Sequence, residues 1–117
     1  MTSQISCHFP KGFLWGTATS AHQTEGNNLN DWSLWEPGKT VDGSVSGIAC
    51  DSYHHFREDI GLAKKLNNNA YRFSIEWSRI EPRQGQFNTK ALRHYQAVIH
   101  ECLKQKIEPV VTIHHFT

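Results

Sequence analysis

FLWGTATSAHQTEG, residues 13–26, is the stretch from which the fold of this chain is predicted. It begins with apolar residues, continues through small ones, and ends with the polar side chains of His22, Gln23 and Glu25. An apolar segment rich in small residues is typical of a strand buried on both faces, here roughly residues 14–19. In parallel α/β folds, ligands bind beyond the carboxyl ends of such strands. The three polar side chains therefore indicate a candidate binding site.

Composition argues against several classes of function. The chain has 117 residues, enough for one small domain, and a formal net charge of +1. A charge so nearly balanced points neither to nucleic acid nor to an anionic membrane surface. No apolar run approaches the roughly 20 residues that a membrane span needs. The first residues lack the basic-then-apolar pattern of a signal peptide, so we expect a cytoplasmic protein.

Cysteine and histidine do not occur at the spacings of a metal or redox site. The three cysteines are odd in number and far apart, which argues against a disulfide framework. Of the eight histidines, two adjacent pairs invite a metal interpretation: His54-His55 in a predicted helix and His114-His115 in a predicted strand. Neighbours on a strand point to opposite faces, and the helical pair lacks the i, i+4 spacing of zinc motifs. We therefore expect no metal site and no cofactor.

The segments after residue 26 predict a loop and then alternating elements. Residues 26–49 show no periodicity, so Trp32 and Trp35 within them either cover a core or wall a pocket. We expect Trp35 to cover the core, and both alternatives stay open for Trp32. Apolar residues at helical spacing predict helices over residues 51–66, capped by Asp51 or Ser52, and over 88–105, capped by Asn88. Asparagines 67–69 end the first helix, and residues 110–116 predict a strand.

Residues 70–77, AYRFSIEW, predict a strand whose two faces differ. Its aromatic and aliphatic side chains alternate with Arg72, Ser74 and Glu76. In a barrel, the polar set points into the lumen, where Arg72 requires a carboxylate nearby. The alternative is that Arg72 faces solvent from an edge strand. Glu76 is expected to be a structural partner of a cation.

The order strand, helix, strand, helix, strand predicts a parallel α/β sheet. Strands laid down in sequence, with right-handed crossovers, place both helices on one face. This matches the opening of a TIM (β/α)8 barrel, whose eight strands take about 250 residues. The predicted fold is therefore an incomplete barrel of three parallel strands and two helices, with residues 1–117 as the N-terminal part of a single domain.

The stretch 13–26 resembles the N-terminal signature of glycoside hydrolase family 1, the β-glucosidase-like enzymes. The matching positions include Trp15, Gly16, His22, Gln23 and Glu25, whereas Asn27 stands where the family has a small residue. The AYRFSIEWSRI segment is also similar to the family. The resemblance covers nearly all of this chain but only the first quarter or so of the family's usual length.

The resemblance implies a retaining β-glycosidase that hydrolyses the O-glycosidic bonds of β-glucosides. Such enzymes use two carboxyl groups about 5 Å apart, as nucleophile and as acid/base. In the family these groups lie in Asn-Glu-Pro and Glu-Asn-Gly sequences, and neither occurs here. Glu36, Glu81 and Glu108 each precede a proline but do not follow an asparagine. No catalytic residue is therefore assigned, and the chain alone is expected to be inactive.

The resemblance also implies which residues hold the sugar. Gln23 matches the glutamine that binds sugar hydroxyls, and His115 matches the histidine that contacts the same ring. Arg72 matches the arginine that steadies the nucleophilic carboxylate. Phe116 stands where the family often has tryptophan, so a stacking face is kept and an indole N–H is lost. The implied ligand is a small β-glycoside or an oligosaccharide.

In a second hypothesis, the chain has no catalytic function. The chain is then a sugar-binding or barrel-completing module that pairs with another polypeptide. The first and third strands are open edges, which invite a complementing fragment or self-association. A third reading, another TIM-barrel enzyme with a similar start, is disfavoured by the signature.

Overall fold

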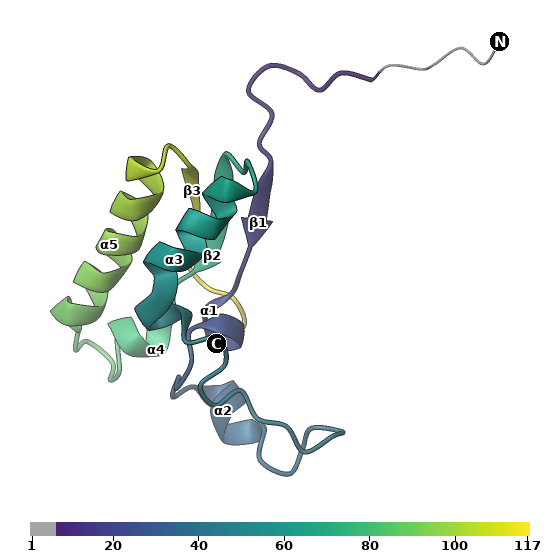
Figure 1. The fold of residues 1–117 in the computed structure, drawn as a ribbon. Helices are drawn as coiled ribbons and strands as arrows, with labels where there is room; N and C mark the ends of the chain where they lie inside the picture. Colours follow the sequence, from purple (N-terminus) through teal and green to yellow (C-terminus); the bar gives the residue numbers. More distant parts are fainter. Residues whose placement is uncertain (1–6) are drawn as a thin grey trace.

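The centre of the protein is a three-stranded parallel sheet with the strand order β1-β2-β3. The computed structural model describes residues 7–117. The strands are β1 (Gly16–Ala18), β2 (Ala70–Ser74) and β3 (Glu108–Thr112). Two long helices connect them, α3 (Ser52–Lys65) and α5 (Thr89–Lys104). Both lie on the same side of the sheet (Figure 1), as predicted.

The core lies between the two long helices and the sheet. Tyr71 and Phe73 of β2 are buried against Ile60 of α3 and Val98 of α5, and Cys102 is fully buried there as a reduced thiol. Because neighbouring residues of a strand point to opposite faces, Arg72 lies on the side away from this core. The alternation predicted for this strand is confirmed for residues 71–73.

Three short helices were not predicted. They are α1 (Ala21–Thr24), α2 (Asp31–Trp35) and α4 (Trp77–Ile80). The stretch 26–49, expected to be a loop, contains α2, which begins with a capping box. The Asn30 side chain accepts from the N–H of Ser33, and the Ser33 hydroxyl accepts from the N–H of Asn30. In Figure 1, α2 and the loop after it extend away from the two long helices.

The predicted strand ends were wrong. β2 ends at Ser74 instead of Trp77, because the N–H of Glu76 donates to the Tyr95 hydroxyl (3.0 Å) and the carbonyl of Glu76 starts α4. β3 begins at Glu108 instead of Val110 and ends at Thr112. Residues 113–117 leave the sheet and turn toward α2.

One asparagine ties the beginnings of all three strands together. Asn69 accepts from the N–H of Trp15 (2.6 Å) and donates from Nδ2 to the carbonyl of Phe13 (3.0 Å). Its own carbonyl accepts from the N–H of Glu108 (2.8 Å). Asn67, two residues earlier, has a left-handed φ of 61° and ends α3, as the asparagine run predicted. The run therefore both stops a helix and aligns the sheet.

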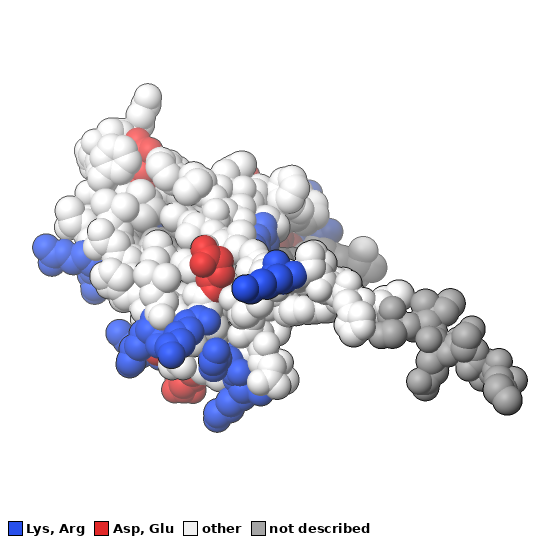
Figure 2. All heavy atoms as spheres, turned by 90° about the horizontal axis from the view of Figure 1, so that it is seen from above, with Lys and Arg blue, Asp and Glu red and all other residues white. Residues whose placement is uncertain are grey.

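The surface carries scattered charge and several exposed apolar side chains. On the face seen in Figure 2, uncharged residues cover most of the area, with Lys and Arg mainly toward one edge. Leu14 and Trp15 before β1 are about half exposed, and Val110 of β3 is 41% exposed. Within residues 7–117, no helix has the length and apolar character that crossing a bilayer requires.

Candidate functional site

A cleft of about 280 Å³ lies beyond the carboxyl ends of the strands, between α1, α2 and the last residues of the chain. Its walls are formed by Ser20, His22, Gln23, Trp32, Glu36, His115, Phe116 and Thr117. Three of the residues chosen from sequence, Gln23, His115 and Phe116, are therefore brought together from opposite ends of the chain. The C-terminus lies close to α1 in Figure 1.

Gln23 is exposed and held in one orientation by its neighbour. The Ser20 hydroxyl donates to the amide oxygen of Gln23, which leaves the NH₂ group without a partner among residues 7–117. Ser20 itself is buried, 3% exposed, just before α1 begins. Gln23 therefore offers the cleft two hydrogen-bond donors.

The opposite wall is fixed by α2. The indole Nε1 of Trp32 donates to the carbonyl of Phe116 at 3.1 Å. Phe116 has a left-handed φ of 65°, and its ring lies edge-on to His115 at 5.1 Å between centroids. The hydroxyl of Thr117 donates to Oε2 of Glu76 at 3.4 Å. These contacts place residues 115–117 over the cleft.

Trp32 and Trp35 line grooves at the surface instead of covering a core. Their rings meet edge to face at 5.5 Å, and both side chains are about half exposed. With Asp31 they line a second, shallow groove on the outer side of α2. The core-covering interpretation of Trp35 is therefore wrong for the residues that the structure describes.

Arg72 does not line the cleft. Its Nε donates to the Thr112 hydroxyl (2.7 Å) and its Nη1 to the carbonyl of Thr19 (3.0 Å). Both partners are neutral, and Arg72 forms no ion pair with residues 7–117. The carboxylate that its position was expected to require is therefore not among them.

Glu76 has neutral partners instead of the expected cation. Its side chain is fully buried and accepts from Asn30 Nδ2 (2.9 Å) and from the Ser78 hydroxyl (2.9 Å). It is thus part of a hydrogen-bonded network behind the cleft. No group of three His, Cys, Asp or Glu side chains within the described chain could hold a metal ion.

Glu25, which the sequence placed with the ligand-binding residues, is instead buried on the far side of α1. It accepts from the Tyr95 hydroxyl (2.8 Å) and pairs with Nε of Arg79 (3.1 Å). Arg79 is held in turn by Asn28 and by the ring of Tyr53, 4.1 Å from the guanidinium carbon. Burial outweighs these partners and raises the pKa of Glu25 to about 7.

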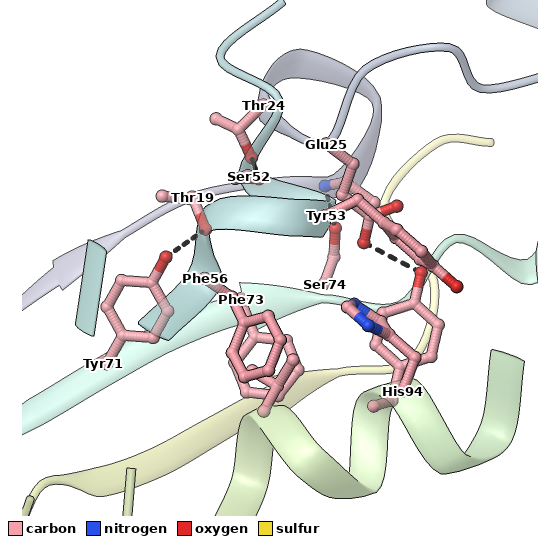
Figure 3. Close-up of a pocket in the computed structure, with 13 residues that line it drawn as sticks. Thr19, Thr24, Glu25, Ser52, Tyr53, Phe56, Tyr71, Phe73, Ser74 and His94 are labelled. Carbon is pink, nitrogen blue, oxygen red and sulfur yellow. Dashed lines mark hydrogen bonds between the residues drawn. The ribbon is translucent and has the colours of Figure 1, made fainter. Parts of the chain in front are cut away.

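A smaller hollow beside Glu25 is not a saccharide site. It measures about 30 Å³, lies between α1, α3, α5 and β2, and is lined partly by hydroxyl groups (Figure 3). Hydrogen bonds join its lining residues, among them Thr19 to Tyr71 (3.2 Å), Ser52 to Thr24 (3.1 Å) and Tyr95 to Glu25 (2.8 Å). A hollow of this volume has room for about one or two water molecules. The larger cleft therefore remains the candidate site.

Sequence reasoning placed His22 with the candidate binding residues, but it missed the contacts that His22 makes with another residue of the cleft wall. His22 bonds Glu36, and the other carboxylate oxygen of Glu36 accepts from the N–H (2.8 Å) and hydroxyl (2.9 Å) of Ser46. The backbone bond from Ser46 and the His22 contact lower the pKa of Glu36 against the opposing effect of burial. The spacing of Asn30 and Ser33 signals a helix start, but no sequence signal pairs Glu36 with His22.

Comparison with known proteins decides the family, because the model of "Glycosyl hydrolase family 1" matches residues 5–117. The chain belongs to glycosyl hydrolase family 1. Beta-glucosidase A of Thermotoga maritima is 44% identical over 117 residues, covering 92% of this chain and 26% of that protein. The chain thus spans about a quarter of the length of this relative.

Solved structures of the family agree in fold. The β-glycosidase BGL167 is 51% identical with a TM-score of 0.87, and the β-glycosidase from Pyrococcus horikoshii is 48% identical with a TM-score of 0.84. Each comparison covers 92% of this chain and 26% of the solved chain. The three parallel strands are therefore part of a family 1 TIM barrel, and the predicted fold class is confirmed.

Proposed function

We propose that this chain is the opening part of a retaining β-glycosidase of the β-glucosidase type, which hydrolyses O-glycosidic bonds of β-glucosides. One observation supports the proposal most: a single cleft contains Gln23, His115 and Phe116, the three residues matched to the family's sugar contacts. The Gln23 amide donates to sugar hydroxyls, His115 contacts the same ring, and Phe116 offers a stacking face.

The proposed chemistry needs groups beyond these residues. Retention requires two carboxyl groups about 5 Å apart, and the sequence lacks both of the family's glutamate motifs. In this proposal Arg72 holds the nucleophile ionised, because a neighbouring cation favours the charged form of a carboxyl group. Among residues 7–117 its hydrogen bonds go to Thr19 and Thr112, so N–H groups of the guanidinium remain for that carboxylate. Residues 1–117 alone are then inactive.

The test combines turnover with binding. We expect the purified 117-residue chain to show no hydrolysis of an aryl β-glucoside. Glucose should quench the tryptophan fluorescence of the chain, because Trp32 lines the cleft. Gln23→Ala should raise the Kd for glucose, measured by this quenching, about five-fold, which is the effect of one lost neutral hydrogen bond. Gln96→Ala, at an exposed position of α5, is the matched control.

Two results would contradict the proposal. Measurable turnover by the pure chain, abolished by Gln23→Ala, would mean that catalysis needs no further carboxylates. Equal quenching in wild type, Gln23→Ala and Gln96→Ala would mean that glucose does not use the cleft.

The second candidate is a non-catalytic module that pairs with another polypeptide. The observation that favours it is the exposure of apolar side chains at both edges of the sheet, Leu14 and Trp15 beside β1 and Val110 in β3. Mixing the chain with a polypeptide that supplies the remaining strands of a family 1 barrel distinguishes the two. Restored hydrolysis supports the glycosidase; a stable complex that binds glucose without turnover supports the module.

A further inference from the structure

His22 joins both ends of α2 to α1. Its Nε2 lies 2.7 Å from Oε1 of Glu36, the residue that closes the C-terminal end of α2. Its Nδ1 lies 3.2 Å from Nδ2 of Asn30, the N-cap of the same helix. The side chains of His22 and Glu36 are 12% and 11% exposed, so little water competes for these bonds. One imidazole therefore fixes the whole length of a five-residue helix.

The donors and acceptors of this network agree with one tautomer of His22. The Asn30 NH₂ group can only donate, so Nδ1 accepts and Nε2 carries the proton that Glu36 accepts. The second N–H of Asn30 donates to Glu76 (2.9 Å), and Ser46 donates to the other oxygen of Glu36. Each partner is thus oriented by a further contact, which fixes the imidazole plane.

Packing does not place α2. None of its five residues is buried, and Leu34 and Trp35 are 72% and 50% exposed. The hydrogen bonds at its two ends therefore decide where the helix sits. This helix carries Trp32, which lines the cleft and donates its indole N–H to the carbonyl of Phe116.

We propose that His22 is a positioning residue: through Glu36 and Asn30 it sets the place of Trp32, and thereby which saccharide rings fit between Trp32 and Phe116. The meaning of the cleft as a saccharide site rests on the proposed function. The positioning of Trp32 does not, so the two are tested separately.

The first experiment contains no ligand. The chain has four tryptophans, and 5-fluorotryptophan labelling gives each a ¹⁹F resonance that Trp→Phe variants assign. We expect His22→Phe, which keeps an aromatic ring and loses both bonds, to move the Trp32 and Trp35 resonances and to leave Trp15 and Trp77 in place. His22→Gln, which can still donate to Glu36, should restore them in part.

Two further variants keep the proposal falsifiable. Glu36→Gln weakens the bond to His22 without a change of side-chain size. If circular dichroism shows that His22→Phe is unfolded, the spectrum of Glu36→Gln tests whether this bond positions Trp32. His100→Phe, at an exposed position of α5, is the matched control and should move no tryptophan resonance. Unchanged Trp32 resonances in both His22→Phe and Glu36→Gln would overturn the proposal.

The second experiment adds glucose. If the wild-type chain binds glucose, His22→Phe should raise the Kd about five-fold or more, close to the effect of losing one contact in the cleft. An unchanged Kd together with a moved Trp32 resonance would overturn the proposal that the position of Trp32 decides which saccharide rings fit the cleft. If no variant binds glucose, the proposed function fails, while the ligand-free spectra still decide whether His22 positions Trp32.

Discussion

Glu25 shows how burial separates polar residues that are near neighbours in the sequence. Gln23 is exposed in the cleft, whereas Glu25 is 6% exposed among Tyr95, Arg79 and Asn28. A carboxylate in such a place keeps its charge at a cost, because the protein interior solvates it less well than water does. Its partners do not fully offset this cost, so its pKa rises to about 7. Glu25 is therefore a pH-sensitive group of the folded chain.

Glu25 should make the chain less stable as the pH rises through neutrality. Its folded pKa is about 7 against an ordinary value of 4.5, so the folded state holds the proton more tightly. The stabilisation is complete below pH 4.5 and is lost as the pH rises past 7. Between pH 5 and pH 8 the free energy of unfolding should fall by roughly 2.5 kcal/mol more in wild type than in Glu25→Gln. Urea denaturation at the two pH values measures this.

The pKa shift of His94 changes stability with pH in the opposite direction to that of Glu25. This effect is the same in wild type and Glu25→Gln, so it cancels in that comparison. Burial and the nearby Arg79 lower the pKa of His94 to about 4, so its contribution to stability is lost as the pH falls below 6.5. Wild type and Glu25→Gln both contain His94. Equal pH dependence in the two proteins would show that Glu25 is already ionised across this range.

The polar residues of the cleft were partly predictable from sequence. Gln23 and His115 were found because they belong to recognisable motifs that follow strands one and three. Glu36 was considered only as a catalytic candidate, since its contact with His22 depends on the capped turn of α2, which periodicity over five residues does not reveal. Partners far apart along the chain are set by tertiary packing and leave no local signal.

At the scale of elements, both long helices were predictable from sequence, but only one of their two side-chain caps was predicted correctly. Asn88 caps α5 as predicted, accepting from the N–H groups of Lys90 and Ala91. Asp51 does not cap α3 with its side chain; it has a left-handed φ of 51° and bonds His54 instead. The strand ends were misplaced because α4 interrupts a pattern that alternates through residue 77. Alternation reports which side chains face the core and not where the hydrogen-bonded ladder stops.

Two glycines in regular elements should respond to alanine with opposite signs. A Cβ at Gly16 in β1 would lie 2.6 Å from the carbonyl oxygen of Ala70 in β2, so the strands would have to separate. A Cβ at Gly61 in α3 would meet nothing within 4 Å. We expect Gly16→Ala to cost about 1–3 kcal/mol and Gly61→Ala to gain about 0.5–1 kcal/mol. Thermal denaturation of both variants checks the pair, and a stabilised Gly16→Ala would mean that β1 does not pair closely with β2.

At the scale of the whole molecule, the sheet has two unpaired edges because order β1-β2-β3 leaves one side of β1 and one side of β3 free. Unpaired backbone groups of an edge strand can pair with another chain. The exposed Val110 adds an apolar side chain at the β3 edge. An open barrel segment therefore has both the hydrogen-bonding groups and the apolar surface that association needs.

The isolated 117-residue chain should self-associate through these edges, and a charge on β3 should oppose it. Val110 on β3 and Leu92 on α5 are each 41% exposed, so Val110→Lys and Leu92→Lys introduce the same charge at equally exposed positions. Because charged side chains on an edge strand disfavour pairing with a second strand, only Val110→Lys should reduce the association. Sedimentation velocity over a range of concentrations measures it for all three proteins. A wild-type chain that stays monomeric throughout, or an equal loss of association in both variants, would mean that the β3 edge is not what brings the chains together.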